Sequence, residues 1–262
     1  MVIERSGLPS AEEAHVRWHD LECGLYSADI GLWLELARQS ALLAPGSPIL
    51  DLGCGTGRVS LALAAAGHEV LALDVDAGLL QALRARAEGL PVTTVHADAR
   101  SFELPQAELG LCIAPMQTIQ LLGGAHGRLQ LLAHARAHLR PGGVLACAIV
   151  TEAEEFDVSR GDLGPGPEVA RTESEIYASR PMSVKVRSGA VRIERMRRIL
   201  SSAGGRPAVE VSAEENVIEL DVLTAAQLAA EAAEAGFRDG GVRKIGATDE
   251  HVGSEVVILV AD

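Results

Sequence analysis

Residues 47–57, which read SPILDLGCGTG, constrain the fold more than any other stretch of this chain. Ile49, Leu50 and Leu52 make a short apolar run that is typical of a buried strand, and three glycines at alternate positions follow it. From Arg58 onward, apolar residues recur at helical spacing. A strand, a glycine turn and a helix form the first unit of a doubly wound α/β sheet, in which the glycines let a ligand approach the backbone closely.

The spacing of these glycines bears on which ligand the turn would bind. The pattern is Gly-x-Gly-x-Gly, and the next residue is Arg58. The fingerprint of dinucleotide-binding folds has a small third residue at the position of Arg58. The turn therefore indicates a nucleoside cofactor but does not decide, by itself, which one.

Length and charge exclude some classes of protein. A chain of 262 residues can bury a full core, either as one elaborated α/β domain or as two small domains. The formal net charge of −13 argues against a sequence-independent nucleic-acid binder, because such proteins need a basic surface to release counterions from phosphates. Aromatic residues make up only 3% of the chain, so leucine, alanine and valine must fill its core.

The start of the chain and its cysteines predict a cytoplasmic protein. No basic stretch leading into an apolar core opens the sequence, as a secretory signal would, and no apolar run approaches the ~20 residues that cross a bilayer. The cysteines are widely scattered, and most lie in or beside apolar strand-like runs, which is typical of reduced, buried thiols. Because no Cys-x-x-Cys pair occurs, we expect no metal site. The cysteines are Cys23, Cys54, Cys112 and Cys147.

Two helices are expected in residues 11–43, before the glycine turn. The second, over residues 30–41, shows the clearer apolar spacing. Tyr26 and Trp33 are two of the few aromatic residues of the chain. Either both pack this arm onto the core, or Tyr26 covers the cofactor pocket.

A carboxylate follows the second expected strand. That strand covers residues 69–73, and Asp74 comes directly after it, 19 residues after Gly55. A carboxylate at this place can accept hydrogen bonds from both ribose hydroxyls of an adenosine-type ligand. Asp76 precedes a helix expected over residues 79–87, so we assign Asp76 to the helix N-cap.

A third strand, over residues 91–96, ends close to Asp98. Ligands in open parallel sheets bind at the carboxyl ends of strands, so Asp98 is a candidate for accepting a hydrogen bond from an adenine amino group. A turn-forming role is the alternative. Strands over residues 109–114 and 144–150 follow, and the helix between them, over 125–139, ends at a Pro-Gly-Gly turn.

Two histidines, His134 and His138, lie four residues apart on that helix. In principle this spacing could chelate a metal. No carboxylate or further ligand accompanies them and Arg136 lies between them, so we interpret them as part of a solvated helix face.

The composition changes after the fifth strand. Residues 151–170 are acidic and rich in glycine and proline, which predicts a long loop, and residues 172–222 alternate like three antiparallel strands. The middle of this meander carries seven basic residues against one acid, Glu194. This basic ribbon either receives an anionic substrate or a partner subunit, or it keeps exposed edge strands from pairing. Its members are Arg180, Lys185, Arg187, Arg192, Arg195, Arg197 and Arg198.

The α/β pattern then resumes with a helix over residues 225–235 and strands over 241–246 and 255–260. The loop between the two strands is too short for a crossover helix, so the strands must pair antiparallel. We therefore predict a Rossmann-like, doubly wound and mostly parallel sheet of seven strands with an antiparallel last strand.

Three parts follow from this division of the chain. Residues 1–46 would form an N-terminal helical arm, and residues 47–150 together with 223–262 would form the α/β domain that binds the cofactor. Residues 151–222 would form an inserted loop and antiparallel meander, which serves either as a lid or as a dimer contact.

Together these features resemble the class I S-adenosylmethionine-dependent methyltransferases. The glycine turn resembles the cofactor-binding loop of that family, Asp74 its ribose-binding acid and Asp98 its adenine-contacting acid. The LRPGG stretch over residues 139–143 resembles the turn into the family's fifth strand, and the terminal pair is similar to its reversed seventh strand. The arm resembles the helical cap of many small-molecule members.

The resemblance implies that S-adenosylmethionine is the cofactor and that a small molecule is the methyl acceptor. The reaction would be an in-line displacement in which the enzyme mainly holds donor and acceptor together and excludes water, so a catalytic base is optional. The implied cofactor site consists of Asp51, Gly53, Cys54, Gly55, Gly57, Asp74, Val75, Asp98, Ala99 and Ala114. The acceptor site would be framed by Tyr26, Trp33, Met116, Gln117, Gln120 and His251.

Two details refine this expectation. Methyltransferases that act on amino nitrogens of nucleic acids and proteins often carry Asn-Pro-Pro-Tyr after the fourth strand, whereas this chain has Ala-Pro-Met-Gln over residues 114–117. The missing amide and aromatic ring disfavour methylation of adenine or glutamine. His251 could act as a general base if it points inward, and otherwise it is a surface-loop histidine.

Three other functions stay open at this point. A nicotinamide-dependent oxidoreductase would share the Rossmann unit, but Arg58 and the antiparallel terminal pair count against it. A non-catalytic protein could keep the cofactor pocket and use the basic meander to form a homodimer. Methylation of tRNA or protein conflicts with the net charge, although the basic ribbon would favour it.

Overall fold

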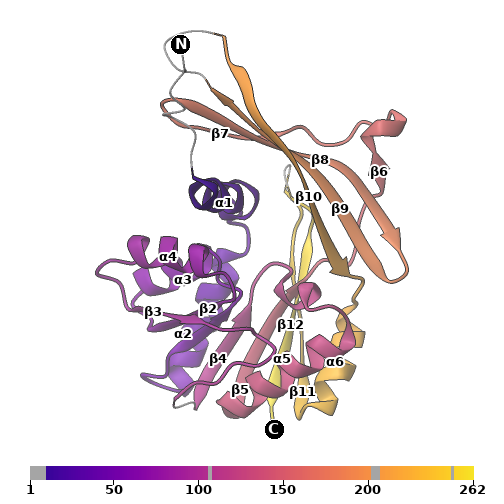
Figure 1. Ribbon diagram of the computed structural model, residues 1–262. Coiled ribbons are helices and arrows are strands. Elements are labelled where there is room, and N and C mark those ends of the chain that lie inside the picture. The colour runs from indigo at the N-terminus through magenta and orange to yellow at the C-terminus, as the bar shows by residue number, and fades with distance from the viewer. Residues whose placement is uncertain (1–9, 106–107, 202–206, 249–250) are drawn as a thin grey trace.

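The computed structural model describes residues 10–105, 108–201, 207–248 and 251–262. Two sheets make up the molecule, one of seven strands and one of five. Helices cover the larger sheet, the smaller sheet extends beyond one end of it, and the first helix lies between the smaller sheet and the α/β layers (Figure 1). The smaller sheet is formed by the segment that the sequence predicts as an insertion.

The larger sheet has the strand order β11-β12-β5-β4-β1-β2-β3. Its last two strands are antiparallel to each other, and β12 is antiparallel to β5, whereas the other pairs are parallel. The predicted reversed strand is therefore confirmed and lies between the fifth strand and the edge. The strands are β1 (Ile49–Leu52), β2 (Val70–Asp74), β3 (Val92–His96), β4 (Leu109–Ala114), β5 (Leu139–Ile149), β11 (Phe237–Ile245) and β12 (Ser254–Ala261).

Two separate apolar clusters hold helices on the two faces of this sheet. One joins the sheet to α2, α3 and α4, and the other joins it to α5 and α6. Neighbouring strand residues such as Ile49 and Leu50 enter different clusters, because successive side chains of a strand point to opposite faces. The helices are α1 (Ala11–His19), η1 (Asp20–Gly24), α2 (Ile30–Leu43), α3 (Arg58–Ala65), α4 (Ala77–Arg86), η2 (Thr118–Leu121), α5 (Ala125–His138) and α6 (Ala225–Glu234). Among the described residues, no helix has the length and apolar character needed to cross a bilayer.

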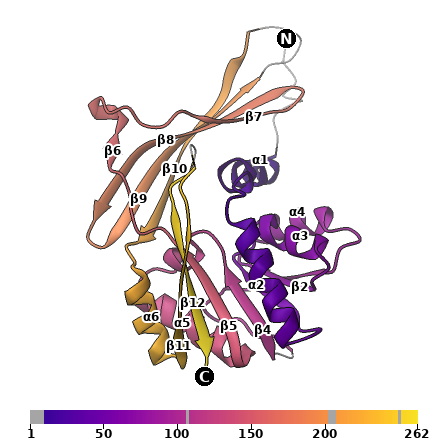
Figure 2. The ribbon, with the colours of Figure 1, turned by 180° about the vertical axis from the view of Figure 1, so that it is seen from behind.

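Two strands are longer than the sequence predicts. β5 begins at Leu139 rather than at residue 144, because the Pro-Gly-Gly segment stays within the strand as an irregularity in its pairing with β4. β11, labelled near β12 in Figure 2, begins at Phe237 rather than at residue 241, and a similar irregularity interrupts the pairing of these two strands. Both segments contain glycines, which interrupt the alternation of apolar and polar residues from which a strand is predicted.

The inserted segment contains more strand than predicted. The expected three-stranded meander is present, with β9 between β8 and β10. Two short strands from the stretch predicted as a loop pair with the other edge of β8. The elements are β6 (Phe156–Asp157), η3 (Val158–Arg160), β7 (Glu168–Arg171), β8 (Glu175–Arg187), β9 (Ala190–Ser201) and β10 (Val209–Asp221).

The interpretation of the basic ribbon as protection of edge strands is wrong for the residues on β9, which is an interior strand of the five-stranded sheet. The outer side of β8 is paired only at residues 176–179 and 183–184, so Arg180, Lys185 and Arg187 lie on unpaired stretches. Most of the ribbon's charges pair with acids of neighbouring segments, as Arg195 does with Glu168 and Arg198 with Glu210. The pairs form across strands, so a count of charges along one stretch of sequence does not reveal them.

The interpretation of His134 and His138 as a solvated face is also wrong. The His138 ring is almost fully buried, stacks on Phe102 at a centroid distance of 5.0 Å, and accepts a hydrogen bond from the backbone N–H of Leu104. His134 contacts the same phenyl ring and the Phe102 carbonyl oxygen. Both histidines therefore attach α5 to the chain segment that precedes β4. Within the described residues, no group of metal-ligating side chains occurs.

Candidate functional site

The glycine turn after β1 has a backbone that only glycine adopts readily. Gly53 and Gly55 have φ angles of 70° and 55°, in the left-handed region. A Cβ atom on Gly53 would lie 2.6 Å from Thr118 Oγ1, and one on Gly55 would lie 2.3 Å from His19 Nε2. The turn is thus covered by side chains from two other elements, the loop after β4 and the N-terminal arm.

Asp74 lies against this turn. Its Oδ2 accepts a hydrogen bond of 2.8 Å from the backbone N–H of Gly55, and its Oδ1 accepts one of 2.9 Å from the N–H of Asp76. Each carboxylate oxygen keeps further acceptor capacity. Asp76 caps α4 by accepting from the N–H of Leu79, as the sequence predicts for this residue.

Asp98 lies at the end of the third strand and forms the turn that we considered as an alternative. Its Oδ1 accepts from the backbone N–H of Arg100, and the Arg100 guanidinium pairs with both carboxylate oxygens. These bonds lower the pKa of Asp98. Val75, at the end of β2, is 67% exposed and offers apolar surface there.

Asp51 is the buried carboxyl group of β1. Its Oδ2 accepts a hydrogen bond of 2.6 Å from the Ser60 hydroxyl, but its Oδ1 is buried without a partner. Burial raises the pKa of Asp51 to about 7. An unpaired buried acceptor costs free energy, so this oxygen marks a place for a donor that the chain itself does not supply.

The residues around the turn fit S-adenosylmethionine on two observations. Asp74 keeps a carboxylate at the turn, and Asp51 has an unpaired acceptor. This ligand carries no phosphate, so the turn does not need to bind an anion. The carboxylates could accept hydrogen bonds from the hydroxyl and ammonium groups of this ligand.

The Asp51 carboxyl predicts a pH dependence of stability. Between its ordinary value of 3.8 and its folded pKa of about 7, the unfolded chain has lost the proton while the folded chain retains it. The free energy of unfolding therefore falls as pH rises through this window, by up to about 1.4 kcal/mol per pH unit. Asp51→Asn should remove this part of the slope in urea denaturation measured from about pH 5 to about pH 7. Equal slopes for the two chains would contradict the assignment.

The arm supplies contacts to the turn that sequence reasoning missed. The His19 ring lies over Gly55, and its Nδ1 is 3.4 Å from Thr56 Oγ1. Thr56 donates to Asp20 Oδ1 at 2.7 Å, and Arg86 pairs with both oxygens of the same carboxylate. Burial lowers the pKa of His19. A π-helical turn, η1, directly follows His19, and such turns are frequent at functional sites.

Arg58, the first residue of α3, joins the N-terminal arm to the glycine turn. It makes two hydrogen bonds to the fully buried Asp29 carboxylate, one of 2.8 Å, and a third to the carbonyl oxygen of Tyr26. Trp33 is fully buried and donates its indole N–H to Asp29. Packing of both aromatic residues onto the core is therefore what the structure shows, and Trp33 presents no free surface to an acceptor.

The loop after β4 holds the other predicted acceptor residues. Met116 has a φ angle of 54°, which is rare for a residue with a side chain and often occurs at functional sites. Gln117 is partly buried directly before η2. The Gln120 amide is buried and bonds to both backbone groups of Val150 and to the carbonyl oxygen of Asp221. Gln120 thus holds the two ends of the inserted segment.

His251 lies against Tyr26, with 4.8 Å between the ring centroids. The imidazole is partly buried, and Tyr26 also bonds to Ser254 of β12. This placement brings the arm and the last loop together, which the sequence predicts for an acceptor site.

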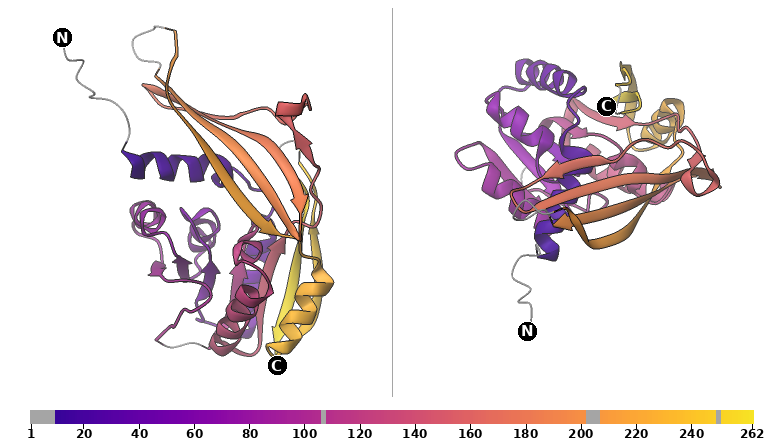
Figure 3. Two further views of the ribbon diagram at one scale, coloured as in Figure 1. Left: turned by 45° about the vertical axis from the view of Figure 1, so that its right-hand side comes forward. Right: turned by 90° about the horizontal axis from the view of Figure 1, so that it is seen from above.

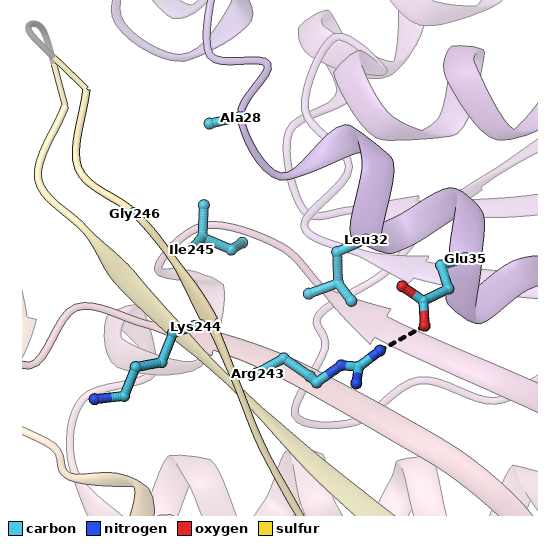
Figure 4. A pocket seen from close by; sticks show the side chains of 7 residues that line it. All are labelled: Ala28, Leu32, Glu35, Arg243, Lys244, Ile245 and Gly246. Atoms are coloured by element: carbon cyan, nitrogen blue, oxygen red, sulfur yellow. Dashed lines mark hydrogen bonds and ion pairs between the residues drawn. The ribbon is translucent and has the colours of Figure 1, made fainter.

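A pocket of about 400 Å³ lies elsewhere, between α2 and β11 (Figure 4). Its walls include Leu32 and Glu35 of α2 and Arg243 of β11, and the guanidinium of Arg243 pairs with Glu35. None of the predicted site residues lines it. This pocket is separate from the glycine turn.

Comparisons with known proteins match the part of the chain that contains the glycine turn. Residues 49–143 match a family described as a methyltransferase domain. The cypemycin N-terminal methyltransferase of a Streptomyces species is 30% identical over 151 residues, 58% of this chain. The chain spans about 60% of the length of that relative.

Solved structures of similar fold cover nearly the whole chain. CalS10 of Micromonospora echinaspora, described as a SAM-bound amino pentose methyltransferase, is 20% identical, covers 98% of both chains and has a TM-score of 0.66. The sugar N-methyltransferase KedS8 of Streptoalloteichus is 16% identical with a TM-score of 0.70, covering all of this chain and 96% of its own. The seven-stranded sheet and the separate antiparallel sheet thus occur together in methyltransferase structures.

Proposed function

We propose that this chain, which carries a class I S-adenosylmethionine-dependent methyltransferase domain, transfers a methyl group to an amine nitrogen of a small molecule. The observation that carries the proposal is the contact between Asp74 and Gly55, which holds a carboxylate at a bare glycine turn. The family match over residues 49–143 supports the choice of cofactor. The names of similar proteins support the choice of acceptor, since an amino pentose, a sugar nitrogen and a chain N-terminus all present amines.

In this proposal each acid around the turn has one role. Asp74 accepts hydrogen bonds from the two ribose hydroxyls, Asp98 accepts one from the adenine amino group, and Asp51 faces the amino-acid end. Apolar and backbone surfaces complete the cofactor site. These are Gly53, Cys54, Gly55, Gly57, Val75, Ala99 and Ala114.

The bound sulfonium would supply an activated methyl group, and the residues of the chain would orient the acceptor toward it. Tyr26, Met116 and Gln117 hold the acceptor so that its nitrogen lone pair faces the methyl carbon in line with the carbon–sulfur bond. The nitrogen–carbon bond forms as the carbon–sulfur bond breaks, and the pair of electrons stays on sulfur. The inserted segment excludes water during this step.

The product amine must lose a proton, and we assign this to His251. General-base assistance contributes typically about 10²–10⁴ in rate, so His251→Gln should lower kcat by about 100-fold at neutral pH while the affinity for S-adenosylhomocysteine stays unchanged. His126→Gln, on the exposed side of α5, is the matched control. An unchanged kcat in His251→Gln would remove the histidine from the mechanism.

The test of the proposed function is an assay with labelled S-adenosylmethionine against a library of amino sugars, amino acids and short peptides. Transfer to one or more amines, strongly reduced at low cofactor concentration in a chain carrying Asp74→Asn, supports the proposal. Transfer only to hydroxyl or carbon acceptors would show a methyltransferase with a different acceptor. Binding of S-adenosylmethionine without transfer to any compound would favour a non-catalytic binding protein.

Two features of the cellular setting belong to the same proposal. All four cysteines lie in the described part of the chain and are free thiols, which suits the reducing cytoplasm. The exposed edge of the inserted sheet at β10 is the surface through which a homodimer would form.

A further inference from the structure

The N-terminal arm is fastened to the inserted sheet by a buried ion pair. Arg197 of β9 makes two hydrogen bonds, of 2.8 and 2.7 Å, to the Glu22 carboxylate in η1. The hydroxyl of Ser179 donates to the same carboxylate at 2.7 Å. The side chains of Arg197 and Glu22 are only 14% and 11% exposed, so loss of either partner would leave a buried charge unpaired.

An apolar cluster surrounds that pair and contains no residue of the α/β domain. Trp18 meets Tyr177 edge to face at a centroid distance of 5.1 Å, and Leu21 and Ile199 complete the buried set. The partly buried residues that pack against it also come from the arm or the insertion. The buried apolar contacts of Trp18, at the end of the first helix, are therefore with the insertion.

The contacts between residues 10–24 and the α/β domain are of a different kind. They include the Asp20 bonds to Thr56 and Arg86, the His19 ring over Gly55, and an exposed pair between His15 and Asp76. A pocket of about 500 Å³ lies between α1 and α4, and residues of both helices line it. Figure 3 shows α1 lying beneath the inserted sheet and above α3 and α4. A polar contact of this kind opens at lower cost than an apolar one.

Both units have narrow connections to the α/β domain. The insertion leaves the domain at Val150 and returns at Asp221, and Gln120 bonds to both of these residues. The arm passes from η1 into α2 through Leu25, which is 72% exposed, and α2 itself packs in the core of the α/β domain. A rotation about these points would leave the core clusters of the sheet intact.

We propose that residues 10–24 and the inserted sheet form one rigid lid over the glycine turn, joined by Glu22 and Arg197 as positioning residues. This inference rests on the proposed function, because the lid would enclose S-adenosylmethionine on one side and border the acceptor on the other. Opening of the lid then admits the cofactor and releases the product S-adenosylhomocysteine. Asp20 is the latch that holds the closed lid to the turn.

The test measures the dissociation rate of S-adenosylhomocysteine by stopped-flow fluorescence. Arg197→Gln should raise this rate by at least tenfold, which corresponds to about 1.4 kcal/mol of lost closure. Arg197→Lys, which keeps one charged contact, should lie between this variant and the native chain. Arg198→Gln is the matched control. Arg198 directly follows Arg197, but its side chain is 55% exposed and pairs with Glu210, which belongs to the insertion and not to the arm.

Two further measurements keep the test decisive if Arg197→Gln folds poorly. Asp20→Asn changes a half-exposed side chain of the latch and should also raise the dissociation rate. Spin labels at Ser174→Cys, in the turn between β7 and β8 far from Asp221, and at Glu88→Cys, in a Cys23→Ser background, report the distance between the insertion and the α/β domain. S-adenosylhomocysteine should shift and narrow the distribution of this distance in the native lid but not with Arg197→Gln present.

The outcomes separate this inference from the proposed function. A native chain that does not bind S-adenosylhomocysteine would overturn the proposed function and the lid with it. A chain that binds this ligand and methylates amines, but whose dissociation rate is the same with Arg197→Gln and Asp20→Asn, would overturn the lid alone. A label distance that the ligand leaves unchanged would do the same.

Discussion

A chain carrying Asp74→Asn is expected to bind S-adenosylhomocysteine about 100-fold more weakly than the native chain. Hydrogen bonds to a charged group contribute about 1.5–3 kcal/mol each, and the variant loses the charge that two ribose hydroxyls would share. A loss of about 2.8 kcal/mol corresponds to two powers of ten in the dissociation constant. Isothermal titration calorimetry at fixed salt and pH measures it directly.

The matched control for this experiment lies two residues further along the chain. Asp76→Asn makes the same chemical change in a residue that caps α4, and asparagine caps helices as well as aspartate does. Its only other side-chain partner in the described chain is His15, in a half-exposed pair that contributes little. A dissociation constant for Asp74→Asn within threefold of the control would mean that Asp74 does not hold the ribose.

The second large effect concerns the free energy of unfolding. Arg58→Met keeps the apolar stem of the side chain but leaves the Asp29 carboxylate, which is 1% exposed, without its charged partner. Breaking a buried ion pair in this way costs about 3–5 kcal/mol. Urea denaturation of the variant should show this loss, and the double variant with Asp29→Asn should recover part of it because no buried charge then remains.

An exposed arginine supplies the comparison for Arg58. Arg198→Met removes a pair in which both side chains are about half exposed, and such pairs contribute about 0–1 kcal/mol. If Arg58→Met destabilised the chain no more than Arg198→Met, the arm would be attached to the core by Trp33 and its neighbours rather than by the ion pair.

The α/β part of the fold could be predicted from the sequence because its signals are local. The apolar run of β1, the glycines after it and the helical spacing from Arg58 follow one another directly in the sequence. The antiparallel end of the sheet followed from the length of one loop. Asp74 and Asp76 could be given separate roles because helix capping depends on the residues that directly follow.

The parts that could not be predicted depend on contacts between distant segments. Nothing in the sequence around Gly55 indicates that His19, 36 residues earlier, lies over it. Arg58 was noticed only as a departure from a fingerprint, whereas the structure shows it bound to the buried Asp29. A long-range ion pair between Glu22 and Arg197 leaves no periodic trace in either segment.

The same reason explains the two wrong interpretations. His134 and His138 looked solvated because the sequence shows no partner from another segment, but Phe102 from a preceding segment packs against both rings. The basic residues of β9 looked unbalanced because their acids lie on β10 and on the arm. Local charge counts describe a strand in isolation, while stability depends on the neighbours across the sheet.

The most direct test of the account is a pair of calorimetric titrations of the purified chain, one with S-adenosylhomocysteine and one with NAD. The account predicts one binding site for S-adenosylhomocysteine with micromolar or tighter affinity, and no measurable heat of binding with NAD. Binding of NAD without binding of S-adenosylhomocysteine would contradict the assignment of the glycine turn, Asp74 and Asp98 to an adenosyl-methionine ligand.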